Sequence, residues 1–159
     1  MFMFLFFISC ANKIRPAVIE KQPPTVETQP TSDRTLLEQL LPHESTLCRD
    51  LSYKSATPWL ELAEMLDVPR PPWVAMRAAA CMIEVYPQQS RGFFLAWLNT
   101  PNQKGLALLL CSSFEQLPIN EQRILLEPAL TGIYAESCAQ RLKNSPIDEV
   151  RERAHKAFP

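Results

Sequence analysis

The sequence predicts an all-α domain, and three observations support that prediction. Glycine is scarce and proline abundant, at 3 and 15 residues in a chain of 159, and prolines commonly mark where helices begin and end. Apolar residues make up 47% of the chain, which is enough for one folded domain with a proper core. No stretch alternates apolar and polar residues with a period of two for long enough to suggest a sheet.

A central helix is expected between Pro71 and Pro87, in the stretch PPWVAMRAAACMIEVYP. Its only charges are Arg77 and Glu84, seven residues apart, so both fall on one narrow stripe of the helix. A helix that is apolar on nearly every side has to be covered on nearly every side. We therefore expect this helix to form an inner layer of the domain.

Shorter elements are expected before this central helix. The Ser32-Asp33 pair can cap a short helix that carries leucines at helical spacing and stops at Pro42. A second helix or turn is expected over 43–53. The Thr57-Pro58 pair places a cap before a proline at the first helical position, which predicts a helix over 59–66.

Further helices are expected after Pro87, over 91–99, 105–117, 120–130 and 132–143. The second of these is expected to open on a capping box at 100–103, and Pro128 is expected to bend or end the third. A last helix is expected to begin at the Ser145-Pro146 cap. Two i,i+4 ion pairs are expected on its solvent side, Glu149 with Arg153 and Glu152 with Lys156.

An internal repeat is indicated by three cap-and-proline pairs that recur 43 and 45 residues apart: Thr57-Pro58, Thr100-Pro101 and Ser145-Pro146. Helix-pair solenoids use periods of roughly 40 to 47 residues. The stretch over 145–154, SPIDEVRERA, resembles the start of the second helix of the HEAT repeat family, with its proline, Asp, Val-Arg and later Ala. A looser match lies over 73–80, WVAMRAAA, and the resemblance as a whole covers about 57–158.

The resemblance implies a short α-α superhelix of HEAT-like antiparallel helix pairs; a non-repetitive, irregular helical bundle is the alternative. In that family the Asp and Arg of the second helix tie neighbouring repeats together. The resemblance therefore implies a repeat-linking, structural role for Asp148 and Arg151, and by analogy for Arg77.

The N-terminus carries an apolar run over 2–9, which is far too short to span a bilayer. Phe7-Ile8-Ser9-Cys10 is similar to the lipobox of bacterial lipoprotein signal peptides, with a small residue directly before the cysteine. Phe7 stands where Leu is usual, and no Lys or Arg precedes the run; a start assigned too far downstream would explain the missing charges. The alternative is a short apolar N-terminus with an incidental cysteine.

The lipoprotein resemblance implies three regions. Residues 1–9 are the remnant of a signal peptide, and Cys10 becomes the lipidated first residue of the mature chain. Ala11 at the next position, rather than Asp, favours the outer membrane, and several acyl chains suffice for stable anchoring. Residues 10–31 then form a lipidated, disordered, proline-rich tether, and 32–159 form the helical-repeat domain.

Four cysteines remain after Cys10, an even number in a chain expected in an oxidising compartment: Cys48, Cys81, Cys111 and Cys138. Three pairings are possible. The pairing of Cys48 with Cys81 and of Cys111 with Cys138 would join adjacent helical units through loops of about 30 residues. The alternative is that some or all are small buried residues. No metal site is expected, because no two cysteines lie close in sequence and no histidine stands at ligand spacing.

No constellation of residues predicts catalysis. His43 and His155 are far apart among exposed-looking residues, and Glu61 and Glu64 suit a solvated helix face. No nucleophile elbow, glycine-rich loop or HExxH motif is present. Aromatic residues could include binding anchors, although most are expected in the core: Trp59, Trp73, Trp97, Phe93 and Phe94.

These observations favour a non-enzymatic, membrane-tethered lipoprotein that binds another envelope protein from the periplasmic side of the outer membrane. With a net charge of −1 and no basic stripe, nucleic acid is not an expected partner, and neither a cofactor nor a small-molecule substrate is inferred. The alternatives are an assembly factor similar in layout to pilotin lipoproteins, a lyase-type HEAT-like enzyme subunit, and a structural stub whose partner is its own membrane.

Overall fold

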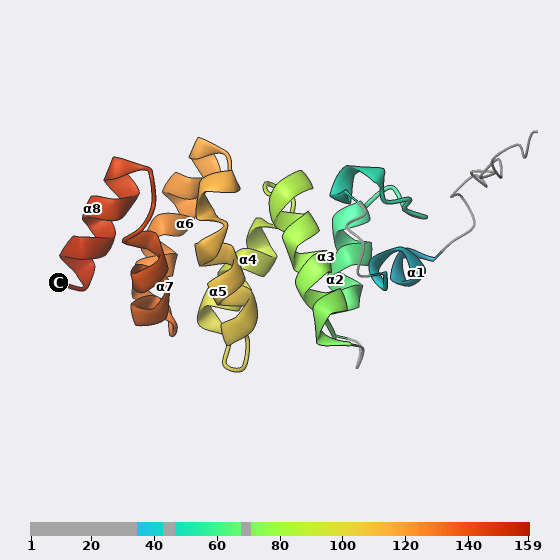
Figure 1. Cartoon of the computed structure of the whole chain (residues 1–159), viewed down its shortest axis with the longest axis horizontal. Coiled ribbons are helices and arrows are strands. Elements are labelled where there is room, and N and C mark those ends of the chain that lie inside the picture. The colour runs from blue at the N-terminus through green and yellow to red at the C-terminus, as the bar shows by residue number, and fades with distance from the viewer. Residues whose placement is uncertain (1–34, 43–46, 68–70) are drawn as a thin grey trace, which may run out of the picture.

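The computed structural model describes residues 35–42, 47–67 and 71–159, and all regular structure within them is helical (Figure 1). The predicted signal remnant, Cys10, the tether, the Ser32-Asp33 cap and His43 lie outside the described residues. The elements, in chain order, are α1 (Leu36–Leu40), η2 (Cys48–Asp50), α2 (Pro58–Asp67), α3 (Pro72–Val85), α4 (Arg91–Asn99), α5 (Lys104–Ser112), η3 (Phe114–Gln116), α6 (Ile119–Thr131), α7 (Ala135–Leu142) and α8 (Asp148–Ala157), where η2 and η3 are single 3-10 turns.

The helices follow one another along the long axis of the molecule, from α1 at one end to α8 at the other (Figure 1). Helix α2 packs on α3, α4 on α5, and α6 on α7. Helices α3, α5 and α7 also contact one another in succession, as do α4, α6 and α8. The prediction of an all-α fold is confirmed, and the arrangement fits an irregular helical bundle; a HEAT-like superhelix stays a prediction. No helix among the described residues is long and apolar enough to cross a membrane.

Helix α3 is the predicted central helix, and it lies in contact with α1, η2 and α2 and, further along the array, with α5. Six of its fourteen residues are buried: Val74, Ala78, Ala79, Cys81, Met82 and Ile83. Its two charges differ in surroundings. Glu84 is exposed, whereas Arg77 Nη1 donates to Leu40 O at 2.9 Å and also to Pro42 O, and so attaches α3 to the end of α1.

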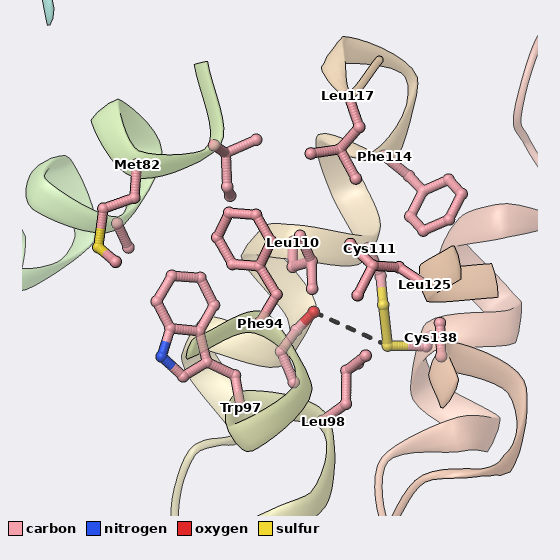
Figure 2. Packing of buried hydrophobic residues seen from close by; sticks show 14 of the residues in the cluster. Met82, Phe94, Trp97, Leu98, Leu110, Cys111, Phe114, Leu117, Leu125 and Cys138 are labelled. Carbon is pink, nitrogen blue, oxygen red and sulfur yellow. Dashed lines mark hydrogen bonds between the residues drawn. A yellow bond between two sulfur atoms is a disulfide. The ribbon is translucent and has the colours of Figure 1, made fainter. Parts of the chain in front are cut away.

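The core runs through the middle of the array without a break. Figure 2 shows Phe94 and Trp97 of α4 between Met82 of α3 on one side and the Cys111–Cys138 disulfide on the other. The Phe94 and Trp97 ring centroids lie 5.1 Å apart. Most of the five aromatic side chains were predicted to lie in the core, but only these two are buried; Trp59 and Phe93 are half-buried, and Trp73 is exposed.

The capping box predicted at 100–103 is wrong. Asn102 has a φ of 69°, in the left-handed region, so the chain makes a turn there and α5 begins only at Lys104. The Tyr134 hydroxyl holds that turn, because it accepts from Gln103 N and donates to Thr100 O, each at 3.1 Å. The predicted helix over 105–117 is divided into α5 and η3.

Other boundaries also differ from the prediction. Helix α6 does not end at Pro128 but continues to Thr131. Helix α8 begins at Asp148, because Ser145 Oγ accepts from Ile147 N at 3.2 Å and organises a turn instead of capping the helix. At the other end of the array, a capping box of Thr35 with Glu38 opens α1.

A groove between helices α6 and α8

Two hollows lie along the seam between α6 and α8. The upper hollow, of about 100 Å³, is lined by the first half of α6, including Ile119 and Leu126, and by the start of α8, including Val150. The lower hollow, of about 310 Å³, is lined by the last turns of both, including Leu130 and Ala157. Because the starts of both helices line one hollow and their ends line the other, α6 and α8 run parallel.

The two hollows exist because α6 and α8 contact each other sparsely. Helix α7, which follows α6 in the chain, packs on both of them. It therefore holds α6 and α8 as neighbours. We call the two hollows together the α6–α8 groove.

One ion pair crosses this groove. Arg153 of α8 binds Glu127 of α6, and both residues line the lower hollow. The predicted pair of Arg153 with Glu149 is therefore wrong, because the guanidinium group reaches across to the neighbouring helix instead. The predicted pair of Glu152 with Lys156 is not among the ion pairs of the described residues either.

The other charged residues of the groove form no ion pair with the described residues. Arg123 lines the upper hollow and Lys156 the lower one, and neither has an ion-pair partner among the residues that the structure describes. Glu149 at the upper hollow is likewise outside any ion pair in that part of the chain. The groove therefore combines apolar walls with two positively charged side chains and one negatively charged side chain that are outside any ion pair in the described part of the chain.

The three residues predicted to link repeats make different contacts. Arg77 joins two elements, α3 and α1. Asp148 and Arg151 bind each other within α8, and Arg151 Nη1 donates to Ser145 O at 3.0 Å. The hydrogen bonds of these two side chains thus stabilise the start of α8, and none of those found among the described residues reaches a neighbouring helix pair.

The four cysteines of the domain lie in two pairs at bonding distance. Cys48 Sγ and Cys81 Sγ are 2.07 Å apart, and Cys111 Sγ and Cys138 Sγ are 2.05 Å apart. Of the three possible pairings, this is the one that closes the two loops of about 30 residues. The first pair ties η2 to α3, and the second ties α5 to α7.

An ion pair between the partly exposed Arg91 of α4 and the buried Glu121 of α6 was not predicted from the sequence. Arg91 Nε and Nη2 donate to the two carboxylate oxygens of Glu121, at 2.8 and 2.5 Å, and the Glu121 side chain is only 1% exposed. The hydrogen bonds to Glu121 raise the pKa of Arg91. An acid in the first turn of a helix is common on the surface, so the sequence carried no signal that this one is buried.

Polar and aromatic contacts gather near the start of α2. Tyr86 lies against Tyr53 and Trp59, with ring centroids 5.9 and 6.3 Å away. Burial, together with the neighbouring Tyr86 and Glu61, raises the pKa of Tyr53 well above its usual range. Glu61, predicted on a solvated helix face, is partly exposed and accepts hydrogen bonds from the backbone of Lys54 (at 3.2 Å) and Ser55.

No group of three or more His, Cys, Asp or Glu side chains within the described ranges is placed to hold a metal ion. His155 is exposed on α8. A scan against family models, a search of curated proteins and a search of solved structures each found no match to this chain. The resemblance of 145–154 to HEAT repeats therefore stays a prediction.

Proposed function

We propose that this protein is a non-enzymatic, membrane-tethered lipoprotein whose helical domain binds another protein of the bacterial envelope. The observation that carries the proposal is the α6–α8 groove, because apolar hollows with charged rims are typical of peptide-binding sites. The exposed Ile119, at 64% of its full accessibility, lies at the upper end of this groove and is a suitable first contact.

Two further observations support the location. Phe7-Ile8-Ser9-Cys10 resembles a lipobox, which favours a lipid anchor on Cys10 and the periplasmic side of the outer membrane. The two cysteine pairs at bonding distance favour a compartment outside the cytoplasm, because disulfides persist in oxidising environments.

Photo-crosslinking in the native bacterial cells tests the binding function. A photoreactive amino acid at position 119 should yield a crosslinked envelope protein, whereas the same group in place of Ile133, which is 55% exposed but does not line the groove, should not. Crosslinks at neither position would contradict the proposal. A crosslinked subunit of an outer-membrane complex would narrow the function to a pilotin-like assembly factor.

Mass spectrometry of the mature N-terminus tests the anchor separately. We expect Cys10 to carry diacylglycerol and an amide-linked acyl chain. An unmodified Cys10 in the mature protein would remove the membrane tether from the proposal and leave the binding function standing.

A further inference from the structure

From the spacing and charge of the two hollows we infer the partner segment that the α6–α8 groove binds. It is an amphipathic α-helix with apolar side chains at positions i and i+7 and an acidic side chain at i+3 or i+4 between them. This inference rests on the proposed function, since it names the kind of partner that the same groove takes.

The spacing of the hollows favours a helix. On α6 the upper hollow is lined by 119–126 and the lower by 127–131; on α8 they are lined by 147–150 and 153–157. The centres of the lining stretches are between six and seven residues apart on both helices, which is about 10 Å at the rise of an α-helix. Two turns of a partner helix, from i to i+7, cover about the same distance on one face.

An extended segment fits the same two hollows poorly. A strand covers about 10 Å in three residues, and side chains three residues apart in a strand point to opposite faces. Only one of the two side chains would then enter the groove. The lower hollow is also about three times larger than the upper one, so the larger of the two apolar side chains belongs there.

The charges of the groove favour an acidic side chain in the middle of the partner's face. The residue at i+3 or i+4 would lie above the pair of Arg153 with Glu127, where the Arg153 side chain is 43% exposed. Arg123 and Lys156 flank this point along the groove. A carboxylate there is attracted by the two arginines and the lysine and repelled by Glu127 and Glu149, so attraction prevails. An ammonium group is repelled by three side chains and attracted by two, so repulsion prevails.

Synthetic peptides test the inference on the purified full-length protein. The probes are three labelled helical peptides of about 16 residues on one alanine-rich background: Leu at i and i+7 with Glu at i+4, the same peptide with Lys at i+4, and a peptide with the leucines at i and i+5. By fluorescence anisotropy, we expect the Glu peptide to bind saturably. The Lys peptide and the i,i+5 peptide should bind about tenfold more weakly or not at all.

Matched variants place the binding on the groove. Ile119→Asp should lower the affinity for the Glu peptide by about tenfold or more. Ile133 is also exposed but lies outside the groove, so Ile133→Asp should leave that affinity unchanged. Lys156→Glu should reduce the preference for the Glu peptide over the Lys peptide, and Lys104→Glu on α5 should not. Circular dichroism of each variant checks that it is folded.

The inference is overturned if no peptide binds at concentrations up to about 1 mM, if the three peptides bind equally, or if Ile133→Asp weakens binding as much as Ile119→Asp. These failures differ from a failure of the proposed function. If position 119 forms a crosslink in cells but the purified protein binds none of the peptides, the proposed function stands and the helical partner is rejected.

Discussion

The two disulfides close loops of similar length, with sequence separations of 33 and 27, but they hold very different structures. Cys48 lies on a single 3-10 turn, and the five-residue α1 is the one other helix among the described residues before α2, which are 35–42 and 47–57. Cys111 and Cys138 join two helices, α5 and α7, that already pack on each other in the core.

The chain-entropy model assigns each bond a similar contribution, about 3.5 kcal/mol, through the unfolded state. The two bonds differ in the other contacts that hold each linked segment in place. The N-terminal segment is attached by a few buried leucines, by Arg77, and by Gln39, whose side chain exchanges two hydrogen bonds with the Ser52 backbone at 3.0 and 2.8 Å. One disulfide therefore supports the cooperative core, and we expect the other to retain a segment that opens locally.

The largest expected effect tests the core disulfide. The double variant Cys111→Ala, Cys138→Ala should lower the free energy of unfolding of the whole domain by about 3–4 kcal/mol, because the unfolded chain gains the freedom of a 27-residue loop. Urea denaturation followed by circular dichroism measures this change. A loss below about 1 kcal/mol would contradict the assignment of this bond to the cooperative core.

The N-terminal disulfide should give a smaller global effect and a larger local one. In Cys48→Ala, Cys81→Ala the global free energy of unfolding should fall by about 1–2 kcal/mol, because the segment leaves before the rest of the domain unfolds. Hydrogen exchange should show lost protection over 36–42 and 47–51 and unchanged protection in α5 and α7. Uniform loss of protection across all helices would show that the two bonds are equivalent.

Gly132 tests whether the C-terminal half depends on close backbone packing as well as on its disulfide. A Cβ at this position would lie 2.6 Å from Leu98 O and 2.8 Å from Pro128 O, both of them backbone atoms that have little room to move. We expect Gly132→Ala to lower the free energy of unfolding by about 1–3 kcal/mol in urea denaturation.

The matched control is Gly105→Ala on α5, where a Cβ would meet nothing within 4 Å. That variant should stabilise the protein by about 0.5–1 kcal/mol, since alanine is the better helix former. Equal effects at the two glycines would contradict the close approach at Gly132.

The smallest expected effect is a pH dependence in the N-terminal half. Partial burial opposes ionisation of Glu61, but the hydrogen bonds from Ser55 and Lys54 outweigh it and lower the pKa of this carboxyl group from its ordinary value. A carboxyl group with a lowered pKa contributes stability that is present above its unfolded pKa and is lost as the pH falls through its folded pKa. The backbone amides of residues 54 and 55 should therefore lose protection against hydrogen exchange as Glu61 is protonated at acidic pH, after correction for the intrinsic pH dependence of the exchange rate. Glu61→Gln should abolish this pH-dependent loss of protection.

Helices with strong local patterns could be predicted from the sequence. Helix α4 has the predicted bounds, Arg91–Asn99, and α3 ends two residues before the proline that was expected to close it. Thr57-Pro58 does open a helix, α2, whereas the pairs at 100–101 and 145–146 do not, because a Thr or Ser before proline suits a turn as well as a helix start. At Thr100 the choice is made by the Tyr134 hydroxyl, 34 residues away in the chain.

The candidate site was less predictable than the fold. The α6–α8 groove has no sequence signature, because it arises from how α7 holds two parallel helices apart. Ile119 and Arg123 look like ordinary surface residues until α8 is placed beside them. The cysteine pairing, by contrast, was one of only three possibilities, and the predicted proximity of consecutive helical units favoured the pairing that is observed.

The pair of Arg91 with the buried Glu121 fixes how far α4 and α6 are shifted along each other. An apolar contact between two helices tolerates sliding by one turn, whereas a two-point hydrogen bond from a guanidinium group to a carboxylate fits only one register. Replacing both residues by methionine should change stability little, since the desolvation cost of the buried Glu121 carboxylate disappears together with its ion pair. We expect instead a mixture of helix alignments, visible as doubled amide resonances in NMR spectra; a single set of resonances would show that packing alone aligns the two helices.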